Sequence, residues 1–424
     1  MGFKVAKSFK FESLKEQGLK LILRFGFVIW LWAFLFARVP MAAIQDLFGL
    51  ESRPLLLLDC LSVGFALVGF SQVGWRPWKV FQVPIVRTAG LSFCFFWIFY
   101  LLRLLFDQWV FSVELVTPAI TLIKHLLTST LIPALCLPWV VAMASWGSTL
   151  FLLVGLGSIS LFFGELSFLF MNGFEALMKV RFGFEDLSPI PAAYSSASLV
   201  IISSLLIWFF FDCQTSRNSR IFQLLFGLIG LLLGLFGMQL AMTKGAFLAL
   251  IPLVVYLGWC LSGRFRAFGF LAVLGVSATA AISMFGSMRR AFWSQGSIQE
   301  RVELLRQSLE VWSDHSFVGV GFRAQGILEA NPFTISNHWY PHNFVVETLL
   351  LGGAVLMALL ASFIVSILLS ASFCASFVRF KDELQVPLTL LWIQGLASAL
   401  VSGHLALIPG MWVGGLLVVM NRYL

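Results

Sequence analysis

The chain has 424 residues, of which 59% are hydrophobic and only 11% are charged. Soluble domains carry about a quarter charged residues, so this composition excludes a soluble globular protein and predicts a membrane protein with many spans. The formal net charge of +8 therefore reflects first how lysine and arginine are distributed across the membrane, and only second an affinity for acidic ligands.

Apolar runs of about 20 residues, separated by turn signals, predict about twelve transmembrane helices along the chain. The expected fold class is an all-α polytopic membrane protein. In the stretch 113–145, Pro118, Pro133 and Pro138 are compatible with a re-entrant segment as well as with a straight helix. The approximate positions of the predicted spans are 20–38, 54–72, 88–106, 126–145, 148–170, 194–211, 221–241, 245–261, 267–286, 344–372, 385–403 and 407–422.

The basic residues predict the orientation of the chain. If the N-terminus lies inside, fifteen lysines and arginines fall in inner segments and only six in the short outer loops and turns. Basic residues concentrate on the cytoplasmic side of membrane proteins. Both termini are therefore expected inside.

One outer loop, residues 287–343, is far longer than the others and separates nine helices in residues 1–286 from three in residues 344–424. Either its arginines pair with its acidic residues, in a loop that is translocated regardless of charge, or they bind an anion. These residues are Arg289, Arg290, Arg301, Arg306 and Arg323 against Glu300, Glu303, Glu310, Asp314 and Glu329.

Part of this long outer loop is predicted to be an amphipathic helix. In SIQERVELLRQSLEVW the apolar residues recur at spacings of four and three, which places them on one helix face. We expect this helix to lie on the outer membrane surface. The apolar stripe consists of Ile298, Val302, Leu305, Leu309 and Trp312.

The segment NHWYPHNF, residues 337–344, places two histidines at the start of the next apolar run. His338 and His342 would share a face of a helix, but Pro341 opposes a helix through both, and we expect no metal site. A helix is expected to begin near Pro341, with His342 in its first turn. At the membrane boundary His342 can accept a proton near neutral pH, and Asn343 can orient a polar substrate. The alternative for either histidine is an ordinary surface hydrogen bond.

Lys244 lies between two apolar runs with almost no loop, on the same side as His342. A lysine in this place either extends toward the surface or faces a polar cavity. A cationic pocket with a histidine, under an amphipathic helix, suits an anionic lipid-linked substrate, because basic side chains stabilise the charge on a leaving pyrophosphate.

These motifs resemble the signature region of the O-antigen ligase and polymerase superfamily. The resemblance rests on Arg301 and Trp312 followed by GVGF, and on PHNFVVETLLLGGAVL. In the second motif His342 and Asn343 precede Gly353 at the spacing of the family.

The matching motifs cover roughly residues 240–360, and the turn TKGA at 243–246 resembles a Ser-Arg-Gly-like turn of the family. Two positions depart from the pattern. Lys244 replaces the usual arginine, which keeps the charge but loses the bidentate geometry. Leu356 stands where a second glycine is usual.

The resemblance implies a metal-independent, inverting glycosyl transfer without a cofactor, on the periplasmic face of the bacterial inner membrane. The donor would be a glycan on undecaprenyl pyrophosphate, and the acceptor a sugar of the lipid A core. His342 would be the general base. The residues expected to bind the substrate or its pyrophosphate are Arg301, Lys244, Arg289, Arg290, Asn343 and His338.

Two alternatives stay open from the sequence, a polymerase and a transporter, and a third is not expected. A polymerase of the same superfamily uses the same chemistry with a lipid-linked repeat unit as acceptor. Relatives that modify proteins usually carry a further C-terminal soluble region, which is not expected here because the last predicted span ends close to Leu424. A transporter with twelve spans would instead show an internal repeat and charges near the middle of the membrane.

Overall fold

The structure of the chain is a computed structural model, and its regular elements are helices, with a single isolated bridge between Phe184 and Leu187 in the described part. This confirms the predicted all-α fold class. The structure describes residues 25–50, 53–113, 118–142, 149–174, 181–184, 189–212, 217–241, 295–324, 343–371, 385–402 and 408–423, with the single residues 115, 187, 243, 246, 250, 251, 253, 328 and 405.

A helical segment Phe25–Leu35 begins the described chain. The elements that follow it are α2 (Arg38–Phe48), α3 (Pro54–Val73), η1 (Arg76–Gln82), α4 (Pro84–Val110), α5 (Ala119–Leu126), η2 (Leu127–Leu131), α6 (Ile132–Ala142), α7 (Thr149–Asn172), α9 (Pro189–Asp212) and α10 (Arg217–Ala241). The C-terminal elements are α15 (Gln295–Ser313), η3 (Gly321–Arg323), α17 (Phe344–Ser370), α18 (Gln385–Ser402) and α19 (Pro409–Tyr423).

Six helices of the described part are long and apolar enough to cross a membrane, and up to eight if each of two bent pairs is one span. The chain is thus a multi-pass membrane protein. The predicted spans 245–261 and 267–286 lie almost wholly outside the described residues. The number of twelve spans and the orientation stay predictions.

Prolines shape the first and fourth predicted spans differently. The segment Phe25–Leu35 and α2 meet at 68°, because Pro40 has no N–H and its ring prevents a regular helical bond to Phe36 O. That oxygen accepts instead from Val39 N (3.1 Å). By contrast, residues 119–142 form one helical run of 24 residues, in which the π-turn η2 precedes the first internal proline. The helical alternative for this stretch is therefore confirmed, and the re-entrant one is wrong.

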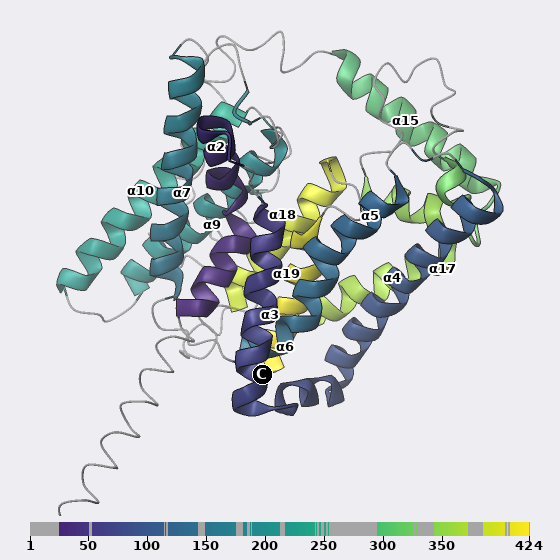
Figure 1. Cartoon of the computed structure of the whole chain (residues 1–424), viewed down its shortest axis with the longest axis horizontal. Helices are drawn as coiled ribbons and strands as arrows, with labels where there is room; N and C mark the ends of the chain where they lie inside the picture. The colour runs from purple at the N-terminus through teal and green to yellow at the C-terminus, as the bar shows by residue number, and fades with distance from the viewer. Residues whose placement is uncertain are drawn as a thin grey trace, which may run out of the picture.

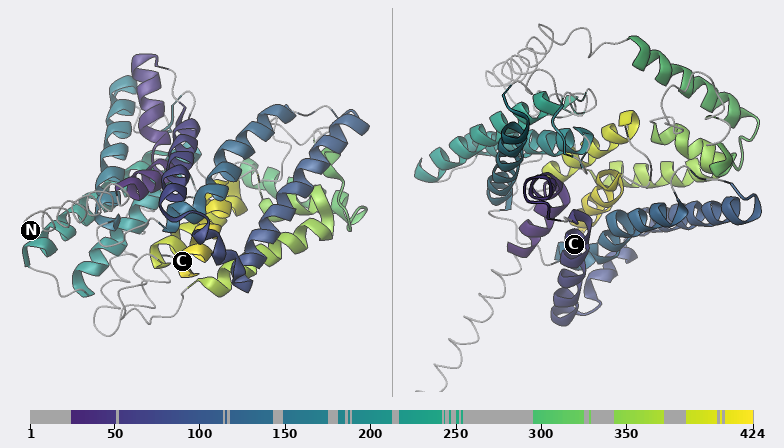
Figure 2. Two further views of the ribbon diagram at one scale, coloured as in Figure 1. Left: turned by 60° about the horizontal axis from the view of Figure 1, so that its bottom comes forward. Right: turned by 45° about the horizontal axis from the view of Figure 1, so that its top comes forward.

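Figure 1 shows two groups of helices: α2, α7, α9 and α10 on one side, and α4 with α17 side by side on the other. The C-terminal pair joins them, because α19 contacts α4, α6 and α17 while α18 contacts α19 and α9. α15 packs across α17 at the edge of the molecule, as the two views of Figure 2 also show. In Figure 1 it lies at the opposite end from the C-terminus.

The helix α17 is broken at Gly353, and the turn that follows α15 fills the break. Gly353 has φ 57° and ψ −147°, a conformation that is strained for residues with a side chain. Val320 N donates to Leu350 O (2.8 Å), and Ala354 N donates to Ser316 O (2.9 Å). The turn thus satisfies backbone groups that α17 leaves without helical partners, which is the condition for irregular backbone at membrane depth.

We predict that Gly353→Ala destabilises the protein, whereas Gly64→Ala in α3 does not. A Cβ at Gly353 would lie 2.5 Å from Phe317 O, in a backbone conformation that costs about 1–3 kcal/mol for other residues. A Cβ at Gly64 would meet nothing within 4 Å. Thermal unfolding of the purified variants in detergent, followed by tryptophan fluorescence, measures the difference. Equal midpoints for the two variants would contradict this account of the break.

Candidate functional site

The helix α15 packs on the first half of α17 through a small apolar cluster. Leu305, Val311 and Trp312 pack against this cluster from α15. The predicted helix is confirmed, but its predicted stripe is only partly used, because Val302 and Leu309 are exposed. The helix instead turns Leu304 and the fully buried Ser308 inward. The buried members of the cluster are Leu304, Val320, Ala324, Leu328, Val346 and Leu350.

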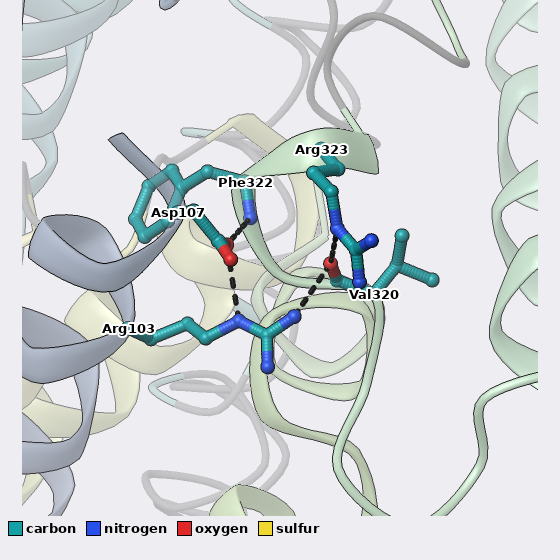
Figure 3. A network of polar contacts seen from close by, with 5 residues as sticks. All are labelled: Arg103, Asp107, Val320, Phe322 and Arg323. Atoms are coloured by element: carbon teal, nitrogen blue, oxygen red, sulfur yellow. Dashed lines mark hydrogen bonds and ion pairs between the residues drawn. The ribbon is translucent and has the colours of Figure 1, made fainter. Parts of the chain in front are cut away.

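A polar network ties the turn after α15 to the last two turns of α4 (Figure 3). The carboxylate Oδ2 of the fully buried Asp107 accepts from Phe322 N (2.6 Å) and from Arg103 Nε (3.0 Å). Arg103 Nη2 also donates to Val320 O (2.7 Å), and Arg323 Nε donates to the same oxygen (3.3 Å). Removing one member of a buried charge pair leaves the other uncompensated, so the network fixes the turn firmly.

The second glycine of GVGF is explained by this network. Gly321 has φ 76°, and a Cβ at this position would overlap both Asp107 and Arg103. The sequence contained a signal for the pair, since Arg103 and Asp107 are four residues apart at the end of a predicted span. The sequence contained no signal that this pair binds the turn around Phe322, which follows more than 200 residues later.

Within the described part of the loop, the arginines differ in whether they pair with loop acids. Arg306 does, with Nη–Oε distances of 3.4 Å to Glu303 and 3.6 Å to Glu310 on the exposed side of α15. Such exposed pairs contribute little to stability. Arg323 makes no ion pair within the described residues and lies 4.4 Å from the centroid of the Phe111 ring. The pairing interpretation is therefore confirmed for Arg306.

Asn343 is the N-cap of α17. Its Oδ1 accepts from Val345 N (3.0 Å) and Val346 N (3.2 Å), and its φ and ψ are extended. The structure confirms the predicted span start at residue 344, but the expectation from Pro341 that His342 lies in the first turn of the helix was wrong, because the extended Asn343 caps the helix that begins at Phe344. His342 therefore comes immediately before the N-cap along the chain.

Arg181, which the sequence did not single out, lies at the C-terminal end of α10. Its Nε donates to Ala241 O (3.2 Å) and its Nη2 donates to Thr243 Oγ1 (3.3 Å). Partial desolvation lowers the pKa of Arg181, and the positive charge of Arg301 on α15 lowers it further. The guanidinium group of Arg181 therefore lies within the electrostatic reach of Arg301.

The contact between Arg181 and α10 reaches the turn that carries Lys244. Ala246 N donates to Thr243 O (3.2 Å), so a hydrogen bond joins the two ends of the TKGA motif. Arg181 thus contacts the first residue of this motif and lies within the electrostatic reach of Arg301. The other sequence-predicted site residues lie outside the described part of the chain, namely His342, His338, Lys244, Arg289 and Arg290.

A buried carboxylate supports the start of α17. Glu347 lies one helical turn after Asn343, and its Oε2 accepts from Leu405 N (3.1 Å) in the connection between α18 and α19. The sequence did not predict this contact either. Among the described residues, no three His, Cys, Asp or Glu side chains are grouped to bind a metal ion.

Two comparisons with known proteins bear on this site. No curated protein matches the sequence of the chain. Residues 229–361 match the family model described as O-antigen ligase, and the matched region contains the second half of α10, all of α15 and the first two thirds of α17. Arg301 and Asn343 lie in this region, and the match confirms the resemblance to the O-antigen ligase superfamily.

Proposed function

We propose that the protein is a membrane glycosyltransferase of the O-antigen ligase type, which moves a glycan from undecaprenyl pyrophosphate onto a sugar hydroxyl of the lipid A core. The observation that carries the proposal is the position of α15. Its Arg301 lies close enough to Arg181 to lower the pKa of that residue, beside the turn with Lys244. Its apolar side packs on the first turns of α17, directly after His342.

In the proposed reaction, His342 takes the proton from the acceptor hydroxyl as the oxygen attacks the anomeric carbon of the donor. The bond from that carbon to the phosphate oxygen breaks, and undecaprenyl pyrophosphate leaves with the bonding electrons. Arg301, Arg181 and Lys244 would stabilise its growing negative charge. Attack opposite the leaving group inverts the configuration at the anomeric carbon.

Each remaining candidate has a place in this proposal. Arg289 or Arg290 would add to the pyrophosphate site. His338 would contact substrate beside His342. The Oδ1 of Asn343 is used in capping α17, so a contact with substrate would come from its amide nitrogen. The site would face the periplasm at the inner membrane, with lipid-linked substrates entering from the bilayer.

A gel of lipopolysaccharide from a deletion strain distinguishes ligase from polymerase. A ligase deletion leaves bare core while polymerised glycan accumulates on undecaprenyl pyrophosphate. A polymerase deletion leaves core that carries a single repeat unit. A normal ladder in the deletion strain would contradict both assignments and favour the transporter alternative. A transporter would be expected to have acidic side chains inside its spans, and Asp59 and Glu165 are buried there.

We predict that His342→Ala lowers glycan transfer by about 10²–10⁴-fold, the usual contribution of a general base. His315→Ala is the matched control, because His315 is exposed in the turn after α15. Both variants are compared at equal membrane abundance, by the lipopolysaccharide ladder and by transfer with purified protein. A His342→Ala protein that restores the ladder would end the general-base assignment.

Replacement of either arginine of the proposed pyrophosphate site should weaken donor use. For Arg301→Gln and Arg181→Gln we expect kcat/KM for the donor to fall about tenfold or more, as for the loss of a charge-assisted hydrogen bond. Arg306→Gln also removes one charge from α15, but at a residue in exposed pairs, and should leave kcat/KM unchanged. An equal loss in all three variants would indicate a general charge effect and contradict a specific site.

A further inference from the structure

We propose that Arg103 and Arg323 form a separate site for the phosphate group of an anionic membrane lipid, at the end of α4 where the turn after α15 docks. Both guanidinium groups lie within hydrogen-bonding distance of one acceptor, Val320 O (2.7 Å and 3.3 Å). Figure 3 shows that they approach this oxygen from two sides.

The charges at this site are not balanced. Asp107 is the carboxylate that pairs with Arg103 (3.0 Å), and its Oδ2 is also engaged by Phe322 N. Arg323 has no acidic partner in the described part of the chain. Two cations against one anion leave an excess positive charge, and the Arg103 side chain is only 15% exposed, so water screens this charge incompletely.

Both arginines keep donors for a further acceptor. The hydrogen bonds of Arg103 use Nε and Nη2, and that of Arg323 uses Nε. Among the described residues, no hydrogen bond engages Nη1 of Arg103 or either terminal nitrogen of Arg323. Planar guanidinium groups with open terminal nitrogens are suited to phosphate oxygens, which can accept from two arginines at once.

The surroundings of the pair identify a lipid as the source of the phosphate. Arg323 lies over the ring of Phe111, which directly follows α4. Trp109 is 78% exposed, and Phe106 and Phe111 are also exposed at this end of the span. Aromatic side chains at the end of a transmembrane helix mark the level of the lipid headgroups, where basic residues bind anionic lipids.

Lipid binding to the purified full chain tests the proposal. Native mass spectrometry in detergent gives the apparent Kd for dioleoyl phosphatidic acid, with dioleoyl phosphatidylcholine as the reference. We expect phosphatidic acid to bind more tightly, and Arg323→Gln to weaken it about fivefold, the effect of one basic residue near an anionic lipid surface. Arg306→Gln, which removes a paired charge on α15, should have no effect.

Arg323→Lys extends the test, because it keeps the charge and loses the fork. We expect this variant to lose less affinity for phosphatidic acid than Arg323→Gln does. It also provides the test if Arg323→Gln does not fold. Unchanged affinity for phosphatidic acid in either folded variant would overturn the proposal. So would binding of inorganic phosphate that depends on Arg323 while lipid binding does not. These measurements read lipid binding and not glycan transfer, so they succeed or fail independently of the proposed enzyme activity.

Discussion

The break of α17 at Gly353 is the constraint on which the described site depends. In a membrane, a backbone group without a hydrogen-bond partner costs several kcal/mol, and water is not available to satisfy it. The turn after α15 supplies partners at Leu350 O and Ala354 N. Asp107 of α4 fixes the turn, because its carboxylate accepts a hydrogen bond from Phe322 N. Because the break in α17 leaves backbone groups without helical partners, the turn after α15 bonds to them, and this places α15 beside α17.

A fixed α15 has an electrostatic consequence at its other end. Arg301 is placed within the electrostatic reach of Arg181, and two like charges repel each other. In the proposed function this repulsion is relieved by the pyrophosphate. Arg181 also bears on the replacement of the family's usual arginine by Lys244. A lysine cannot bind an anion in bidentate fashion, and the nearby Arg181 brings a guanidinium group to the same turn from a different loop.

Local patterns in the sequence predicted the elements of this region, but not their contacts. Apolar periodicity correctly predicted α10, α15 and α17. The span prediction placed the start of α17 correctly at residue 344, whereas the proline rule wrongly placed His342 in its first turn and overlooked the capping preference of Asn343. The apolar stripe predicted for α15 was partly wrong, because the helix buries Leu304 against α17 and the turn after α15, whereas the prediction assumed packing on the membrane surface. The substitution at Leu356 is accommodated, since this side chain is fully buried against Gly352.

The contacts that build the site join segments far apart in the chain, which no short motif records. Arg181 meets α10 about 60 residues later, and Asp107 meets Phe322 more than 200 residues later. Single-sequence patterns report burial and turn preference within about one element, so a cation contributed by a distant loop leaves no signal in them. The His-Asn pair, on which the proposed site rests, could be recognised because it is local: it combines the N-cap of α17 with a group that can accept a proton.

That combination gives the start of α17 a chemical role of its own. Three contacts hold this half of the helix: the apolar cluster with α15, the bond from Val320 to Leu350 O, and the bond from Leu405 to Glu347. A helix N-terminus held in this way presents a fixed positive potential, which favours negative charge beside it. His342 directly precedes that N-terminus along the chain. In the proposed reaction, the same helix that orients the base therefore also favours the anionic substrate on which the base acts.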